Sequence, residues 1–496
     1  MLFNSYIFVF LFLPATLLTY YLSRRALGRE ASLIVLVVAS IIYYAYWKVE
    51  YLAILIVSIS INYSIGYGLI KYKTLGARKA LVTTGIVLNL AGLGYYKYAN
   101  FFIENVQTLT GLEFSNLHIL LPLAISFFTF QQIAYLIDCY RNEAKEYSFS
   151  HYCLFITFFP QLIAGPIVHH KEMLPQFMDK MKAFFDYNMF WKGLLQFCIG
   201  LFKKVIIADT IALYATPIFF AADQGNSITM VEAWIAILAY SFQLYFDFSA
   251  YSDMAIGIGR MFGIDLPANF NSPYKARSIE EFWHRWHMTL SRFLRDYLYF
   301  TFGGNRKGPF RRYLNLILTM LLGGLWHGAS WNFVAWGALH GIYLIINHCT
   351  AYVKNALNLN ASNNRLLNIL SVALTFLAVI LAWVLFRAET FSGAFIIYAA
   401  SINLDSLLNH GLSSAPLPII SEPLMAYAMI MICALITFMC PNTQEFIDGI
   451  QQRVETHRLK LSLTKLNLGL SAAVSGLLIF SLASMNKVSE FLYFQF

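Results

Sequence analysis

Two histidines stand where an imidazole is not expected in an apolar sequence. His327 lies between Gly324 and Gly328, and glycines let other backbone or a ligand approach closely. Ionisable groups inside membrane-type segments are costly and usually functional, and a neutral imidazole there can accept a proton from a hydroxyl group. The sequence therefore predicts either a general base at His327 or a buried histidine bonded to a neighbouring helix.

The second histidine, His287, belongs to a basic stretch at 275–312, which holds nine Lys and Arg residues against three acidic ones. Ser278 followed by Glu281 fits a capping box, so we expect an amphipathic helix that begins there and lies at, or dips into, the cytoplasmic membrane surface. His287 falls on the side of an apolar stripe formed by Trp283, Trp286, Leu290, Phe293, Leu294 and Tyr297. It is either a functional group or a hydrogen-bonded histidine anchored at an interface.

Polar side chains also interrupt other apolar stretches. They are Gln131, Gln132, Gln161, Asp247 and Asp253. These side chains either line a polar tunnel or bond helices together, and Gly337 and Gly341 have the spacing of close helix packing. The chain ends on aromatic residues at 491–496. They form either an interfacial aromatic belt or a tail folded into an outer cavity, where Tyr493 presents its hydroxyl as an acyl acceptor.

The elements that must position these residues are membrane helices. Charged residues make up 12% of the 496 residues, about half the usual share, whereas apolar residues reach 58% and the mean hydropathy is +0.59. A soluble globule of this size cannot hide that much apolar surface from water. The net charge of +9 is explained by Lys and Arg in cytoplasmic loops, with no nucleic-acid partner. The composition therefore predicts an all-α polytopic protein in the lipid bilayer.

About 20 mostly apolar residues are needed for one span, and the chain offers about eleven or twelve such stretches. They lie near 5–22, 31–48, 51–70, 80–97, 117–137, 187–220, 231–250, 313–326, 329–347, 366–386, 423–440 and 468–486. The stretch 151–168 is apolar but broken by Pro160, Gly165 and Pro166, which predicts a re-entrant segment. The charges of the loops place both ends of the chain outside.

The domain organisation follows from the same pattern. We expect one membrane domain over 1–496, with a core at about 120–390 and a C-terminal tail at 487–496. The six cysteines include no CxxC pair and mostly lie in or beside apolar stretches. We therefore expect neither a disulfide framework nor a metal site, and no tightly bound cofactor.

Several motifs together resemble those of the membrane-bound O-acyltransferase family. The likeness is to its bacterial branch that acylates cell-envelope polymers, the branch of the membrane subunit of alginate O-acetylation. The motifs are SFFTFQ at 126–131, PQLIAGPI at 160–167, DFSAYSD at 247–253, NSPY at 271–274, EFWHRWHMTLS at 281–291 and WHG at 326–328. The resemblance implies the membrane-bound O-acyltransferase fold, with a tunnel that joins the two membrane faces.

The resemblance also implies roles for single residues. His327 matches the family's near-invariant active-site histidine, and His287 matches its usual second partner. The tail pattern Phe-x-Tyr-x-x-Phe implies that Tyr493 carries the acyl group. The residues expected to bind substrates are Trp326, Arg285, Gln131, Asn271, Phe491 and Phe496.

The implied activity is a relay across the bacterial inner membrane. Acetyl-CoA, held by the basic stretch at 275–312, gives its acetyl group to Tyr493, and a periplasmic SGNH-type partner passes it to a polysaccharide such as alginate. Peptidoglycan, cellulose or O-antigen are alternative acceptors for the same chemistry. A transporter or flippase is an alternative of another class, because many spans, a broken segment and buried polar groups fit one as well.

Overall fold

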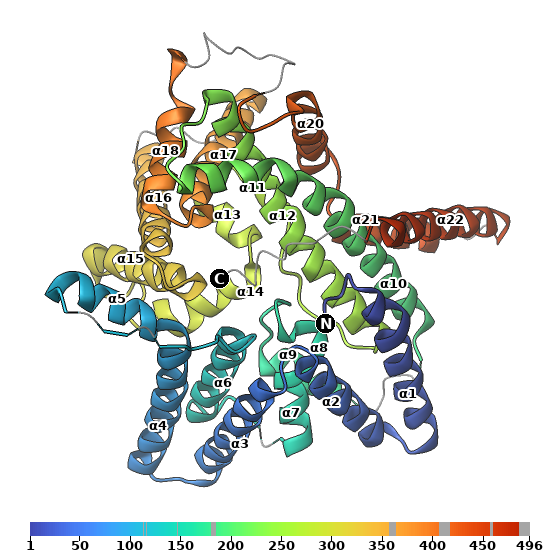
Figure 1. The fold of residues 1–496 in the computed structure, drawn as a ribbon. Helices are drawn as coiled ribbons and strands as arrows, with labels where there is room; N and C mark the ends of the chain where they lie inside the picture. Colours follow the sequence, from blue (N-terminus) through green and yellow to red (C-terminus); the bar gives the residue numbers. More distant parts are fainter. Residues whose placement is uncertain are drawn as a thin grey trace. The chain divides into compact units, whose positions relative to one another are not determined.

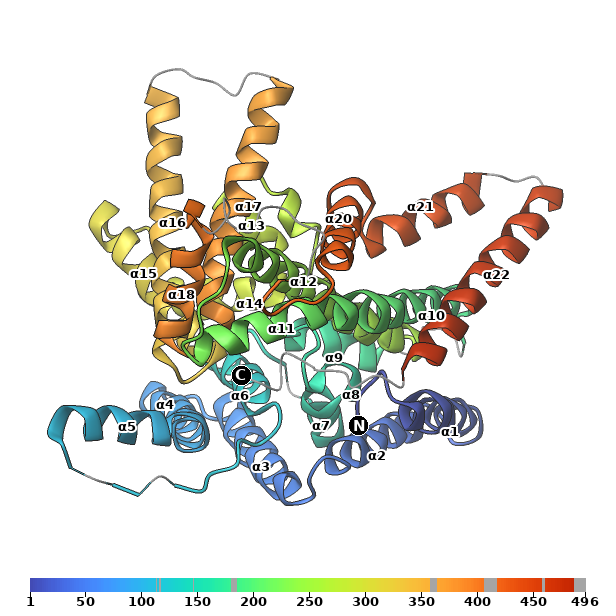
Figure 2. The ribbon, with the colours of Figure 1, turned by 45° about the horizontal axis from the view of Figure 1, so that its top comes forward.

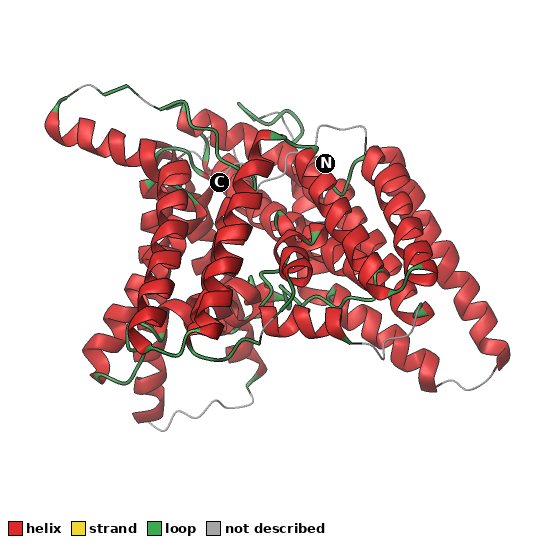
Figure 3. Cartoon of the chain, turned by 90° about the horizontal axis from the view of Figure 1, so that it is seen from below, coloured by secondary structure: helices red, strands yellow, loops and turns green. Residues whose placement is uncertain are grey.

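The computed structural model describes residues 1–496 except 113, 116, 146, 180–184, 357–363, 406–416, 457–459 and 486–496. Its described part contains helices and loops and no strand (Figure 3). The predicted all-α fold is thereby confirmed. The chain divides into two compact units: unit 1 is Met1–Cys198 with Tyr251–Ala268, and unit 2 is Ile199–Ala250 with Asn269–Phe496. The expectation of a single domain stays a prediction.

Unit 1 holds most of the helices of the N-terminal half. In chain order they are η1 (Ile7–Phe12), α1 (Leu13–Ala26), α2 (Arg29–Ala45), α3 (Glu50–Lys71), α4 (Leu75–Leu93), η2 (Gly94–Tyr98), α5 (Ala99–Thr110), α6 (Ile125–Tyr140), α7 (Phe149–Thr157), α8 (Phe159–Leu162), α9 (His170–Met178) and most of α10 (Tyr187–Phe202) (Figure 1). Helix α6 packs against α3 and α4, and α2 packs against α1 and α7. These contacts bury nearly the whole of α6.

Unit 2 holds the helices that carry both candidate histidines. They are η3 (Lys203–Ala208), α11 (Asp209–Asp223), most of α12 (Met230–Met261), η4 (Pro273–Lys275), α13 (Ile279–Arg285), α14 (Met288–Phe293), η5 (Leu294–Tyr299), α15 (Gly308–His327), α16 (Trp331–Ala356), α17 (Arg365–Arg387), α18 (Phe391–Ser401), α20 (Pro423–Met439), α21 (Thr443–Thr456) and α22 (Lys460–Ser484). Helix α16 packs against α15 on one side and against α17 on another (Figure 2).

Close packing of α15 on α16 depends on two glycines. A Cβ atom at Gly324 would collide with the carbonyl oxygen of Phe333, and one at Gly337 would collide with that of Met320. The two backbones therefore approach more closely than larger residues allow, as small residues permit in membrane helices. This confirms helix packing as the role of Gly337, and it holds the end of α15 in a fixed place.

Several helices have the length and hydropathy of membrane spans. Among the described residues, four helices are long and apolar enough to cross a membrane: Ile7–Ala26, Glu50–Lys71, Tyr187–Asp223 and Arg365–Arg387. Pro423–Met439 and Thr443–Ile450 pass the same test as a pair bent by 54°. The chain thus has several apolar helices, while the expected total of eleven or twelve spans stays a prediction.

The stretch 151–168 is broken as its prolines predicted. Helix α7 ends at Thr157, Phe158 adopts a non-helical conformation (φ −47°, ψ 106°), and the short α8 follows. The residues after Leu162 leave the helix, and Gly165 lies so close to the Gln161 backbone that a Cβ atom would collide with it. The irregular backbone is buried within unit 1, which is the setting that such a segment requires.

Candidate active site

His327 is the last residue of α15, and aromatic rings surround it. Its ring centroid lies 4.9 Å from that of Trp326, 5.2 Å from Trp336 on α16 and 5.0 Å from Phe386 on α17. The side chain is 7% exposed. Gly328 ends the helix in an extended conformation, and a Cβ atom there would collide with the ring of Phe333. In the described structure the glycine therefore admits a neighbouring side chain close to the histidine.

His287 lies at a break between two helices, so the prediction of one continuous amphipathic helix is wrong. Ser278 caps α13 as predicted, but Trp286 is extended (φ −100°, ψ 128°) and His287 is left-handed (φ 42°, ψ 54°). A non-glycine residue pays about 1–2 kcal/mol for that conformation. Tertiary hydrogen bonds hold the break, because the Met288 N–H donates to the Asn269 carbonyl.

The expected capping box forms only in part. The Ser278 hydroxyl accepts a hydrogen bond from the Glu281 N–H at 3.1 Å, whereas the Glu281 carboxylate accepts from the N–H of Arg277 rather than of Ser278. The apolar stripe lies in the protein interior and not on an exposed surface. All six of its residues are buried: Trp283, Trp286, Leu290, Phe293, Leu294 and Tyr297.

The surroundings of His287 favour an uncharged imidazole. The side chain is fully buried, the ring of Phe248 meets it edge-on at 4.8 Å, and its Nδ1 lies 3.1 Å from the amide oxygen of Asn269. His287 lies outside the predicted spans, and burial lowers its pKa to about 3. Because an amide oxygen can only accept, Nδ1 carries the proton and Nε2 keeps its lone pair. His287 is thus a preformed neutral base.

Trp326 brings the two predicted catalytic histidines into one cluster. The centroid of its ring lies 4.9 Å from His327 and 6.3 Å from His287. The cluster continues into Trp336, Trp383 and Phe386, whose rings contact one another at 5.1–5.7 Å. A site lined in this way is apolar and excludes water, which strengthens any electrostatic interaction inside it.

His340 on α16 is a third buried histidine near the cluster, and it is hydrogen-bonded to a neighbouring helix. Its Nδ1 accepts a hydrogen bond from the indole N–H of Trp283 at 3.3 Å, and it is fully buried. Its Nε2 has no hydrogen-bond partner within the described residues, and neither has the indole N–H of Trp336. The rings of His340 and Trp336 lie 4.9 Å apart. The otherwise apolar cluster therefore also contains these two polar atoms.

Arg285 and Asn271 are already engaged with protein groups. The Arg285 guanidinium pairs with Glu281 at 2.7 Å and donates to the Asn271 carbonyl at 3.3 Å. The Asn271 amide oxygen accepts from Asn442 at 3.0 Å. These contacts fix the chain on either side of the His287 break. Their predicted role in binding substrate stays a prediction.

The remaining predicted site residues belong to unit 1 or fall outside the described residues. Gln131 is buried on α6 in unit 1. Phe491, Tyr493 and Phe496 lie outside the described residues. Of the other polar side chains in apolar sequence, Gln161 donates to the Phe155 carbonyl at 2.6 Å, so it bonds the broken segment to itself.

Two sets of buried polar contacts were missed by sequence reasoning. Asn269, which orients His287, precedes it by 18 residues and carries no motif of its own. Lys204 forms ion pairs at 2.7 Å with both Asp209 and Asp247, and all three side chains are buried. A signal for this second group was present, because a lysine in an apolar span needs a buried counter-ion. Asp247 therefore bonds helices together.

Comparison with known proteins identifies the family of the chain. The family model described as membrane-bound O-acyltransferase matches residues 140–386, a range that contains both His287 and His327. The peptidoglycan O-acetyltransferase of Helicobacter pylori is 44% identical over 433 residues, which cover 82% of this chain and 81% of that protein. The probable alginate O-acetylase of Azotobacter vinelandii is 39% identical over 519 residues and 100% of both chains.

A more distant relative acts on another polymer. The teichoic acid D-alanyltransferase of Streptococcus thermophilus is 27% identical over 280 residues, which cover 53% of this chain and 68% of that protein. The names of these three relatives share the transfer of an acyl group and differ in the polymer they mention.

Proposed function

Because the chain belongs to the membrane-bound O-acyltransferase family, we propose that it transfers acetyl groups for the O-acetylation of a cell-envelope or exported polysaccharide. The transporter alternative is thereby set aside, since the chain is an acyltransferase. The observation that carries the proposal is the cluster in which Trp326 contacts the rings of both His327 and His287.

The cluster suits base-catalysed acyl transfer from a thioester. His327 takes the proton from an attacking hydroxyl, whose oxygen forms a bond to the thioester carbonyl carbon. The carbon–sulfur bond then breaks, and the proton passes from the imidazole to the leaving thiolate. His287, which burial keeps neutral, assists His327 from the same aromatic cluster. The aromatic wall excludes water that would otherwise hydrolyse the thioester.

Acetyl-CoA is the donor that the charges of unit 2 support. Arg306, Lys307 and Arg311 are exposed at the start of α15 and form no ion pair within the described residues. Three cations in six residues attract the phosphates of a nucleotide-bearing thioester. Arg285 contributes less to donor binding, because Glu281 and Asn271 already occupy its guanidinium.

The acceptor side of the proposal rests on the family resemblance. Tyr493 receives the acetyl group on its hydroxyl, and Phe491 and Phe496 seat the tail in the site. A periplasmic SGNH-type partner then moves the group to the polymer, which places the protein in the bacterial inner membrane. The names of the relatives support alginate or peptidoglycan as the acceptor.

The test uses the full chain in lipid nanodiscs with acetyl-CoA labelled in the acetyl group. We expect release of free CoA and labelling of the protein, with both lost in His327→Ala. His118→Gln, an exposed-loop substitution, is the matched control and keeps full activity. If Tyr493→Phe still releases CoA and the polymer is still acetylated in cells, the relay through the tail is wrong. If wild-type protein releases no CoA, the donor assignment fails.

A further inference from the structure

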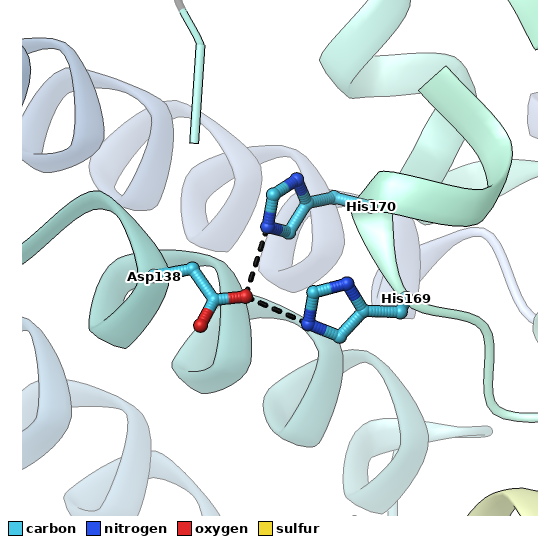
Figure 4. A group of neighbouring side chains, drawn as sticks. All are labelled: Asp138, His169 and His170. Atoms are coloured by element: carbon cyan, nitrogen blue, oxygen red, sulfur yellow. Dashed lines mark hydrogen bonds and ion pairs between the residues drawn. The ribbon is translucent and has the colours of Figure 1, made fainter. Parts of the chain in front are cut away.

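Three side chains outside the candidate active site converge on one point in unit 1. The carboxylate oxygen Oδ2 of Asp138 lies 2.7 Å from Nε2 of His169 and 2.9 Å from Nε2 of His170 (Figure 4). The three ligand-type atoms all lie within 4.8 Å of one another. Consecutive residues seldom aim their side chains at the same atom. Here they do so because His169 is extended and His170 begins α9.

The two helices that carry the cluster give it an unusual electrostatic setting. Asp138 lies in the last turn of α6, where free carbonyl groups make the potential negative and favour a cation. Arg78 already donates to the carbonyls of Cys139 and Tyr140 at this helix end. The histidines lie at the start of α9, where the positive end of the helix disfavours an imidazolium. The site therefore combines a carboxylate at a negative helix end with two imidazoles at a positive one.

We propose that Asp138, His169 and His170 bind a divalent transition-metal ion of the Zn²⁺ class. Two imidazole nitrogens and one carboxylate oxygen are a ligand set that zinc accepts, with water in the fourth position. Tetrahedral bonds of about 2.0 Å require the ligand atoms to separate to about 3.3 Å. The Oδ2–Nε2 distances of 2.7 and 2.9 Å must therefore widen by about 0.6 and 0.4 Å.

Burial and access also suit a metal site. His170 and the Asp138 side chain are almost completely buried, whereas the His169 side chain is 21% exposed and offers a path of entry. Lys171, the nearest cation along the chain, is paired with Glu143, which reduces its repulsion of an incoming ion. The cation ties the end of α6 to the start of α9, across the broken segment, so its role is structural.

The position of the proton on each imidazole predicts which of the two histidines binds the metal ion more weakly. Metal binding needs the lone pair of Nε2, so the proton moves to Nδ1. Nδ1 of His170 has no hydrogen-bond partner within the described residues and can take it. Nδ1 of His169 lies 3.3 Å from the N–H of Lys171, from which it accepts a hydrogen bond. His169 is therefore the weakest of the three ligands.

The experiment uses the purified full chain, stripped of metal with a chelator and then titrated with Zn²⁺ against a chromophoric chelator. We expect one Zn²⁺ per chain, and a loss of affinity of more than about 100-fold in Asp138→Asn and His170→Gln, beyond what loss of an outer-shell group causes. His169→Gln changes the most exposed ligand, so we expect a smaller loss of Zn²⁺ affinity. It also provides a folded variant for the test if the variants of the two buried residues do not fold. His118→Gln is the matched control and binds as wild type.

Two readings would overturn the proposal. The first is a failure of the titration to depend on the cluster: the wild type binds no Zn²⁺, or His169→Gln and every folded variant of the other two residues bind it as tightly as the wild type. The other is a thiolate-to-metal charge-transfer band in the spectrum of the Co²⁺-loaded protein, which would place the ion on the exposed Cys349 or Cys440. A Co²⁺ spectrum without that band, and a thermal midpoint that Zn²⁺ raises in wild type but not in Asp138→Asn, support the site.

Discussion

Two regions of this protein each hold a pair of histidines, and the imidazoles of the two regions face different partner atoms. In unit 2, His287 faces an amide oxygen and aromatic rings, so it is neutral and carries its proton on Nδ1. In unit 1, His169 and His170 face the carboxylate of Asp138, which accepts a hydrogen bond from each. Burial alone would raise the pKa of Asp138, but these hydrogen bonds lower it below its usual range.

The comparison teaches that burial by itself does not assign a histidine to catalysis. His287 and His170 are both almost fully buried, and burial lowers the pKa of each. The nature of the partner atom separates them. The amide oxygen of Asn269 is a neutral hydrogen-bond acceptor, so His287 stays an uncharged base. The carboxylate of Asp138 instead accepts a hydrogen bond from the imidazole of His170, or binds a cation together with it.

The largest difference should appear when one histidine of each region is removed. We expect His327→Ala to lower the rate of CoA release by at least about 100-fold, the usual contribution of a general base. His170→Gln should leave that rate within about threefold, because the cluster of Asp138, His169 and His170 has a structural role and does not handle the transferred proton. A His170→Gln variant that is folded but inactive would break the comparison.

The second prediction concerns a substitution that gives His287 a carboxylate partner, as Asp138 is for the histidines of unit 1. In Asn269→Asp, a carboxylate replaces the amide oxygen 3.1 Å from His287 and raises the pKa of the imidazole. We expect the rate to fall about tenfold as the pH drops from 8 to 5, because the base becomes protonated. In the wild type, His287 should cause no such fall of the rate between pH 8 and pH 5. A pH–rate profile of both proteins checks this, and identical profiles would contradict it.

The third prediction concerns stability against pH. The pKa of His287 is about 3 in the folded chain and 6.5 ordinarily, so the unfolded chain binds the proton more tightly between those values. Stability from this group is complete above pH 6.5 and is lost as the pH falls toward 3. Thermal midpoints in detergent should therefore fall from pH 7 to pH 5, and fall less steeply in Asn269→Asp. An equal slope in both proteins would assign the acid sensitivity to other groups.

The smallest effect is expected in the aromatic wall. The indole N–H of Trp383 donates to the Tyr274 hydroxyl at 3.1 Å, which itself donates to the Ser241 carbonyl at 2.7 Å. Trp383→Phe keeps an aromatic ring and removes that donor. We expect a loss of about 1–2 kcal/mol in unfolding free energy and little change in the rate of CoA release. A thermal-shift series with Trp383→Phe against wild type measures it.

The sequence predicted much of the fold because apolar runs and prolines act locally. The break in 151–168 follows from prolines, and the start of α13 follows from Ser278. The break at His287 could not be predicted in this way, because the apolar residues on both sides of His287 keep the spacing of one continuous helix. The bond from Met288 to the Asn269 carbonyl, which opens the helix there, joins positions that sequence spacing does not connect.

The sequence by itself determined the membrane class, the all-α fold and the choice of the two candidate histidines, since hydropathy and motifs reside in neighbouring residues. Only the tertiary structure decided what those histidines face. Asn269 lies 18 residues from His287, and Asp138 lies 32 residues from His170. Neither pair belongs to one helix, so its contact depends on how helices pack. The partner atom, which sets the proton's position, is therefore fixed by the fold.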